Sequence, residues 1–110
     1  MTIHQELERA VEDLEATLKA ASLWQVETPA PTAFASRQPF CVDTMSLPQW
    51  LRFVFVARLH ALIEAQAPLP EKCDVAPAVA AYLQQQRART SDRLLVVQSV
   101  ERLDEMITRH

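Results

Sequence analysis

Glycine is absent from this chain of 110 residues, whereas proline occurs seven times. Glycine is the residue that reaches positive φ angles without steric cost, so tight two-residue hairpins are costly to build here. The glycine-rich loops that cradle phosphate groups in nucleotide-binding proteins are excluded for the same reason. Hairpin-rich β folds are therefore disfavoured, and connections marked by proline are expected instead.

Length and composition predict one globular domain over residues 1–110. Apolar residues make up 49% of the chain and charged residues 23%, which is typical of globular rather than disordered proteins. The net charge of −3 argues against phosphate binding as the main role. The start of the chain is too polar for a signal peptide, and the longest apolar segment carries Arg52, Arg58 and Glu64. We therefore expect a cytoplasmic protein that does not cross a membrane.

Two cysteines, Cys41 and Cys73, are interpreted as reduced thiols of a cytosolic protein. A metal site that combined them with His60 would lack a closely spaced pair of ligands. We expect neither a metal ion nor another cofactor.

Hydrophobic periodicity predicts four helices and no strand. Their expected ranges are about 2–22, 46–66, 75–87 and 90–109. The apolar stripe of the first helix is Leu7, Val11, Leu14, Leu18 and Ala21, and that of the last is Val96, Val100, Leu103 and Ile107, widened by Leu95 and Met106. The predicted fold class is all-α, a four-helix bundle with a long proline-containing strap between helices 1 and 2.

Local capping signals support the helix starts. Thr2 with Gln5, and Ser46 with Gln49, have the spacing of a capping box. Asp74 is the expected cap of the third helix.

The strap, residues 25–45, is long for a connection inside a compact domain. It contains Pro29, Pro31 and Pro39, with Phe34 and Phe40 between and beside them. Two interpretations stay open. Its aromatic side chains pack onto the bundle, or the strap is a binding loop.

The second helix is apolar on two sides when residues are placed at about 100° intervals. One face carries Leu51, Phe55, Val56, Leu59, Leu62 and Ile63, and the other carries Trp50, Val54, Ala57, Ala61 and Ala65. We expect this helix to be the central one, with a further helix lying close against the alanines.

Arg58 is a charged residue within this apolar helix. A guanidinium in such a place reaches water or pairs with a carboxylate. Asp43 is the expected partner because its loop leads into the same helix. The predicted role is a structural clamp, and the alternatives are an anion-binding arginine or an exposed side chain.

Two further groups have the residue types of acid–base chemistry. His60 is interpreted as a capping or surface histidine, with a general base as the alternative. Asp43 and Thr44 are expected to satisfy free N–H groups at the helix entry, and the alternative is an acid–hydroxyl pair. Their neighbourhood contains no recognisable catalytic constellation.

A modest basic stretch joins the last two predicted helices and contains Arg87, Arg89 and Arg93. A solvated corner between helices is the expected role. RNA contact is the alternative, which the lack of interleaved aromatic side chains weakens.

The chain resembles the YqcC-like family of small uncharacterised bacterial proteins. The resemblance is carried by Gln38-Pro39-Phe40, Asp43-Thr44-Met45, Trp50-Leu51, Arg58 with His60, and Pro68-Leu69-Pro70. Taken together these motifs are specific, and because the chain length and the position of each motif also fit, the resemblance covers nearly the whole chain. Cys41 and Val42 stand where the family pattern has larger apolar residues, which alters packing detail.

The resemblance implies an all-helical fold and no established enzymatic activity. Genes of the family are often found beside a gene for a tRNA pseudouridine synthase of the TruC type. The resemblance therefore implies an accessory role near tRNA modification, with such a synthase as the candidate protein partner and RNA contacted only indirectly.

The leading hypothesis is a non-catalytic interaction module. It offers Phe34, Pro39 and Phe40 of the strap, or the acidic first helix, as contact surfaces. The second hypothesis is a small-molecule or catalytic pocket lined by Asp43, Thr44, Arg58 and His60. The third is direct RNA contact through Arg87, Arg89 and Arg93. A homo-oligomer is also compatible with the narrow stripe of the first helix.

Overall fold

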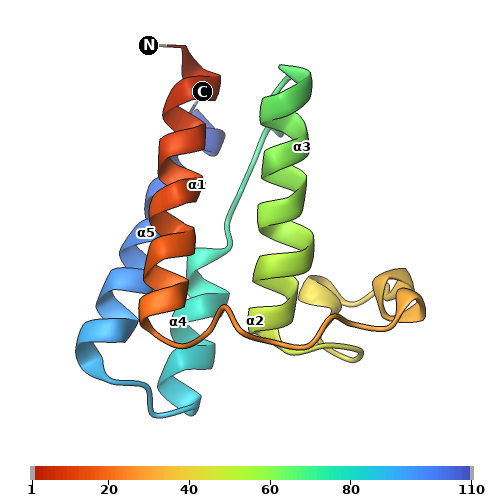
Figure 1. Cartoon of the computed structure of the whole chain (residues 1–110), viewed down its shortest axis with the longest axis vertical. Coiled ribbons are helices and arrows are strands. Elements are labelled where there is room, and N and C mark those ends of the chain that lie inside the picture. Colours follow the sequence, from red (N-terminus) through yellow and green to blue (C-terminus); the bar gives the residue numbers. More distant parts are fainter. Residues whose placement is uncertain (1, 110) are drawn as a thin grey trace.

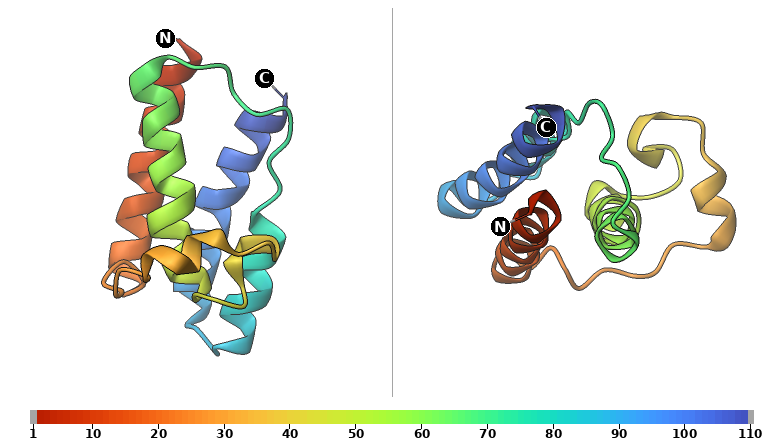
Figure 2. Two further views of the ribbon diagram at one scale, coloured as in Figure 1. Left: turned by 90° about the vertical axis from the view of Figure 1, so that its right-hand side faces the viewer. Right: turned by 90° about the horizontal axis from the view of Figure 1, so that it is seen from above.

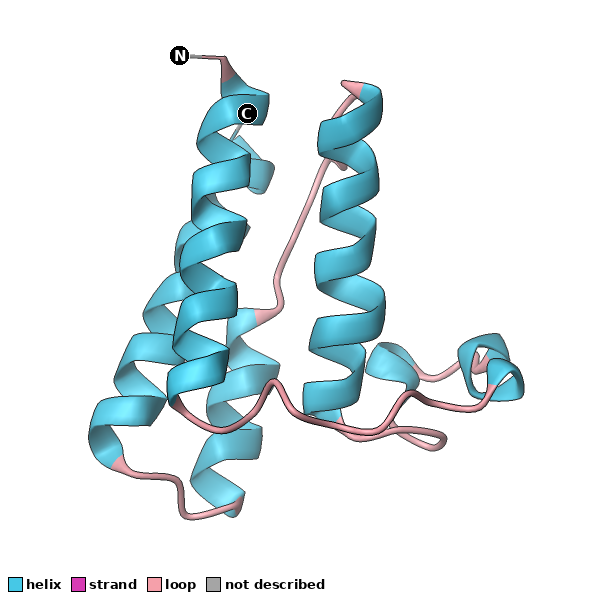
Figure 3. Cartoon of the chain, viewed as in Figure 1, coloured by secondary structure: helices cyan, strands magenta, loops and turns pink. Residues whose placement is uncertain are grey.

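The structure, a computed structural model, describes residues 2–109. Over this range the chain is all-α and forms four long helices, as predicted (Figure 1). They are α1 (Ile3–Ala20), the continuous helix α2–η3–α3 (Leu47–Trp50, Leu51–Val56 and Ala57–Ala65), α4 (Ala76–Gln85) and α5 (Thr90–Arg109). The strap contains two short 3-10 turns, η1 (Pro31–Ala35) and η2 (Pro39–Cys41). Figure 3 shows that helices and loops account for the described chain.

Helix α1 lies between α5 on one side and α3 on the other (Figure 2, right). Its capping box is present, with Thr2 and Gln5 each accepting a hydrogen bond from the other's backbone N–H. Four members of the predicted stripe, Leu7, Val11, Leu14 and Leu18, are buried, whereas the fifth, Ala21, follows the end of the helix and is half-buried. Helices α1 and α5 each pack against two other helices, whereas the second helix packs mainly against α1, so the prediction that the second helix is central was wrong.

The second helix contains a feature that periodicity did not predict. Residues Leu51–Val56 form a π-helical segment, η3, inside an otherwise regular helix. A π segment inserts about one extra residue, which turns the following side chains by about 100°. The helix starts as predicted, at the Ser46–Gln49 capping box with Pro48 in its first turn.

The alanine face of this helix is not covered by another helix, so that prediction was wrong. Ala57, Ala61 and Ala65 are exposed. The strap takes that side instead and covers only the beginning of the helix, where Val54 is buried against Ala33 and Met45. Figures 1 and 2 show the strap extending sideways from the bundle, next to α2.

Helices α4 and α5 complete the core. Val79 and Leu83 of α4 are buried, as are Val96, Val100, Leu103 and Ile107 of α5. Leu95 was expected to widen the buried face of α5, but its side chain is 52% exposed. The core lies between the four helices because each contributes one apolar stripe to it.

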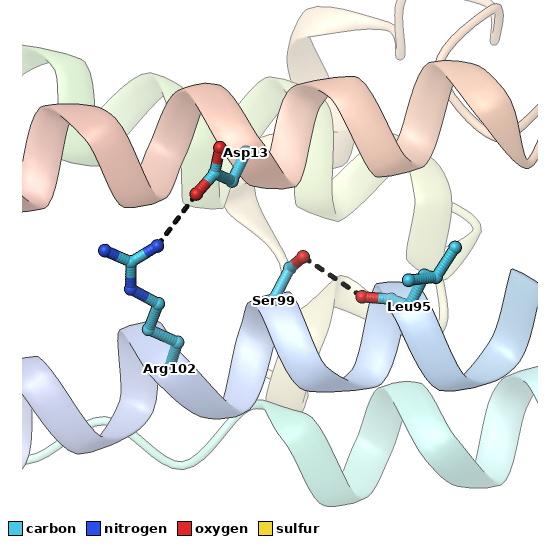
Figure 4. Close-up of polar contacts among 4 residues, drawn as sticks. All are labelled: Asp13, Leu95, Ser99 and Arg102. Atoms are coloured by element: carbon cyan, nitrogen blue, oxygen red, sulfur yellow. Dashed lines mark hydrogen bonds and ion pairs between the residues drawn. The ribbon is translucent and has the colours of Figure 1, made fainter.

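Polar contacts join the helices at their edges. Arg102 of α5 donates a hydrogen bond to Asp13 of α1 over 2.7 Å, and Ser99 donates one within α5 to the Leu95 carbonyl over 3.0 Å (Figure 4). The Arg102–Asp13 pair is more than half exposed, so it stabilises the fold by at most about 1 kcal/mol. Beyond the C-terminal end of α1, Arg52 donates to the Trp24 carbonyl over 2.6 Å and lies over the Trp24 ring.

The lack of glycine is reflected in the helix ends. Ser22, Gln66 and Arg87 follow α1, α3 and α4 with φ angles of 61°, 52° and 54°, the left-handed region that glycine usually occupies. Each such residue costs roughly 1 kcal/mol. None of the helices within residues 2–109 combines the length and apolar character needed to cross a membrane.

Candidate functional site

A groove of about 470 Å³ lies between the strap and the second helix. Its lining is mostly apolar and aromatic. The lining residues are Phe34, Ser36, Gln38, Phe40, Cys41, Trp50, Phe53, Val54, Ala57, Arg58 and Ala61. The strap and the exposed part of the alanine face thus meet in one concave surface.

Hydrogen bonds within the strap fix its shape. The Thr44 hydroxyl lies 2.8 Å from the Ala33 carbonyl oxygen and 3.2 Å from that of Cys41, so it is placed to donate to either. The Ser36 hydroxyl donates to Asp43 and accepts from the backbone N–H of Gln38 over 3.1 Å. These contacts hold the two ends of the strap loop together.

Phe40 and Cys41 have an unusual backbone. Their φ angles are 58° and 51°, so two consecutive non-glycine residues lie in the left-handed region. This geometry places the Phe40 ring edge-on against Trp50, with ring centroids 4.9 Å apart. Trp50 in turn stacks on the buried Phe55 at 5.5 Å, so an aromatic series joins the strap to the core.

The predicted Arg58–Asp43 clamp is not formed. Asp43 is bound to Ser36, whereas Arg58 is exposed and has no ion-pair partner among residues 2–109. The reason is that the strap loop closes on itself, so its carboxylate is used before the helix begins. Of the three roles considered for Arg58, the exposed and the anion-binding ones remain.

His60 and Thr44 do not form a common site either. His60 is a surface residue whose ring nitrogen lies 2.8 Å from the Glu15 carboxylate of α1. Thr44 binds strap carbonyls, and neither Thr44 nor Asp43 caps the helix, which is the role of Ser46. Among Asp43, Thr44, Arg58 and His60, Arg58 alone lines the groove. The predicted four-residue pocket is therefore not formed.

The other predicted contact residues are at the surface. Phe34 is 43% exposed, Pro39 is exposed, and Phe40 and Trp50 are half-buried and line the groove together with Phe34. In the basic corner, Arg87 and Arg89 are exposed and Arg93 is half-buried.

A second polar cluster, at the start of α4, was not predicted. Asp104 of α5 accepts hydrogen bonds from the backbone N–H groups of Val75 and Ala76 over 2.8–3.0 Å. Asp74, the predicted cap, is exposed and does not cap the helix. Asp104 follows Val100 by four residues on α5, so the sequence places it beside the apolar stripe. That position was the signal that could have identified it as a residue facing another helix.

Cys73 belongs to the same cluster. Its Sγ lies 3.1 Å from an Asp104 carboxylate oxygen and donates a hydrogen bond to it. Burial is the largest of the causes that together raise the pKa of Cys73 to about 12, and the others are the hydrogen bond to Asp104 and the charges of Asp104 and Asp74. A thiol with such a pKa is a poor nucleophile at neutral pH, so the cluster is structural.

The fold and the groove define an all-α protein with a strapped four-helix bundle. Comparison with known proteins identifies the family. The DUF446 family, described as tRNA pseudouridine synthase C, matches residues 6–106, so the chain belongs to this family.

Individual relatives confirm the YqcC-like resemblance. The chain is 35% identical to the uncharacterised protein YqcC of Escherichia coli over 104 residues, which cover 94% of this chain and 93% of that protein. The solution NMR structure of YqcC from E. coli has a TM-score of 0.81 and 33% identity, covering 98% of this chain and 90% of that one. The four-helix fold is therefore shared with an experimentally determined relative.

Two other relatives match over part of their length. An uncharacterised protein of Haemophilus influenzae is 42% identical over 69 residues, which cover 63% of this chain and 65% of that protein. A tRNA pseudouridine synthase C of Pectobacterium carotovorum is 37% identical over 70 residues, which cover 64% of this chain and 19% of that protein.

Proposed function

We propose that the chain is a non-catalytic accessory domain that docks directly onto a tRNA pseudouridine synthase of the C type. The similarity to the Pectobacterium protein carries the proposal. The similar segment makes up 19% of a protein with that name, so most of that protein lies outside it. Our interpretation is that a domain like this one is joined to the enzyme in that relative.

The scattered positions of the acid–base candidates support a role without chemistry. Asp43 is bound to Ser36 within the strap, whereas His60 lies against Glu15 of α1. A general acid or base must lie within hydrogen-bond reach of the reacting group, and these two serve different surfaces.

Docking between two separate proteins requires a higher intrinsic affinity than docking between two domains joined by a linker. A short flexible linker supplies an effective concentration in the range of about 1 mM, so a fused domain can remain docked with weak intrinsic affinity. The 110-residue chain lacks this contribution when it is mixed with a synthase as a second protein. We therefore expect a dissociation constant in the micromolar range or below for this chain and its synthase.

Co-expression with the C-type synthase of the same organism tests the proposal. After nuclease treatment, size-exclusion chromatography with light scattering should give a complex whose mass is the sum of both proteins. A pseudouridine synthase of another type serves as the control and should elute separately. Separate elution of the C-type synthase would contradict the proposal, as would a complex that dissociates when RNA is removed.

A further inference from the structure

We propose that the groove between the strap and the second helix is the docking site for a helical segment of the synthase. That segment would present a large apolar side chain next to a carboxylate. This inference rests on the proposed function and specifies which surface serves it.

The aromatic wall of the groove favours an apolar side chain. Phe34, Phe40, Trp50 and Phe53 all line it, and Phe34 is 43% exposed. Exposed aromatic residues around a concave surface are typical of the central residues of protein interfaces. They supply contact area with little conformational entropy to lose, since each has two side-chain torsions.

The charge of the groove favours an acidic partner. Among the described residues that line it, Arg58 is the one that carries a charge. Other grooves of the molecule are rich in carboxylates, such as those with Glu8 and Glu12 or with Glu101 and Glu105. In a chain of net charge −3, the side chains that line this groove thus carry one positive and no negative charge. A carboxylate of the partner would pair with Arg58, which has no ion-pair partner within residues 2–109.

The alanine face indicates the shape of the partner. Ala57 and Ala61 line the groove and are exposed, and Ala65 continues the same face one turn further. Small side chains at every fourth position let the backbone of a second helix approach to about 8 Å. No helix of the described chain uses this face, so it is available to a helix of the partner.

The strap holds the groove open before a partner arrives. The left-handed geometry at Phe40 and Cys41 is unfavourable for residues with a side chain. It is maintained by backbone hydrogen bonds from Cys41 to Gln38 and from Met45 to Cys41, of 3.1 and 3.0 Å. A groove that is already formed loses less entropy on binding, which strengthens association.

Isothermal titration of the C-type synthase with the purified protein and four variants tests the inference. Arg58→Glu reverses the groove charge, and Ala61→Glu places a charged, longer side chain in the groove. Arg89→Glu and Ala81→Glu make the same changes at exposed positions of the basic corner and of α4. The groove variants should weaken binding at least about tenfold, whereas the control variants should stay within about twofold.

The possible failures are distinguishable. Binding of both groove variants within about twofold of the unaltered protein would overturn the groove inference and leave the proposed function standing. No binding of the unaltered protein would overturn both. All substituted positions are on exposed helix or corner surfaces, so folding should be retained, and circular dichroism melting curves verify this before each titration.

Discussion

Removing the Asp104 carboxylate should destabilise the protein far more than removing the neighbouring Asp74. In Asp104→Ala, the backbone N–H groups of Val75 and Ala76 lose their acceptor at the start of α4. Both residues are buried, with 6% and 5% of their surface exposed, so water replaces the carboxylate poorly. The Cys73 thiol loses its acceptor at the same time.

The expected decrease in the free energy of unfolding follows from the hydrogen bonds that Asp104→Ala removes. A helix cap is worth roughly 0.5–2 kcal/mol, and a hydrogen bond to a charged group roughly 1.5–3 kcal/mol. Because the two N–H groups share one carboxylate, we expect a total loss of about 2–3 kcal/mol in the free energy of unfolding. For a protein of this size that lowers the melting temperature by roughly 10–20 °C. Asp74→Ala removes an exposed charge near the helix start, with an expected cost below about 1 kcal/mol.

Urea denaturation followed by circular dichroism measures both variants under the same conditions. Asp104→Asn adds a useful comparison, since it keeps one acceptor oxygen without the charge and should lie between the two. Equal losses for Asp104→Ala and Asp74→Ala would refute the reasoning, and so would a loss below about 0.5 kcal/mol for Asp104→Ala.

Three further predictions concern other parts of the chain. Because burial raises the pKa of Cys73 from 9.0 to about 12, the unfolded state releases this proton first as the pH rises. The contribution of the protonated thiol to the free energy of unfolding is therefore complete below pH 9 and is lost towards pH 12. In thermal melts, the melting temperature of the unaltered protein should fall more steeply at alkaline pH than that of Cys73→Ala. Cys41→Ala is the cysteine control. Arg87→Gly should raise the free energy of unfolding by about 0.5–1 kcal/mol relative to Arg87→Ala in urea denaturation, because φ is 54° there; equal stability would contradict this. Arg52→Ala should cost about 1–3 kcal/mol by the same assay, because the guanidinium donates to the Trp24 carbonyl and lies 4.6 Å from the ring; a cost below about 0.5 kcal/mol would mean that water replaces both contacts.

Features that depend on neighbouring residues were predictable from the sequence. The capping boxes at Thr2 and Ser46 join residues three positions apart, and both are present. The stripe from Leu7 to Leu18 follows from helix periodicity and is buried. Local spacing is enough to determine such features, because a helix brings these positions together wherever it lies in the fold.

Features that depend on distant segments were not predictable. Asp74 had the right place in the sequence to cap α4, but Asp104, thirty residues further on, has the right place in space. The alanine face was read correctly as apolar, yet periodicity could not show that the strap, and not a helix, would lie on that side. Sequence spacing gives no information on which element packs against a face.

The sequence identified the residues of the candidate site better than it identified the contacts between them. Phe34, Phe40, Trp50 and Arg58 were all singled out, and the groove brings them together. Asp43 was assigned to Arg58, but a serine within the strap binds it first. The π-helical segment η3 adds to this difficulty, because it changes the phase of the helix between Trp50 and Arg58.

The proposed docking of this chain onto a C-type tRNA pseudouridine synthase through the groove can be measured directly. Its two tryptophans allow one direct measurement, since Trp50 lines the groove and Trp24 lies below Arg52 at the end of α1. The indole N–H signals of the ¹⁵N-labelled protein would be recorded by NMR while unlabelled synthase is added. We expect the synthase-dependent broadening or shift to be larger for the Trp50 signal than for the Trp24 signal. Unchanged signals from both tryptophans at synthase concentrations of about 100 μM, well above the expected dissociation constant, would contradict it.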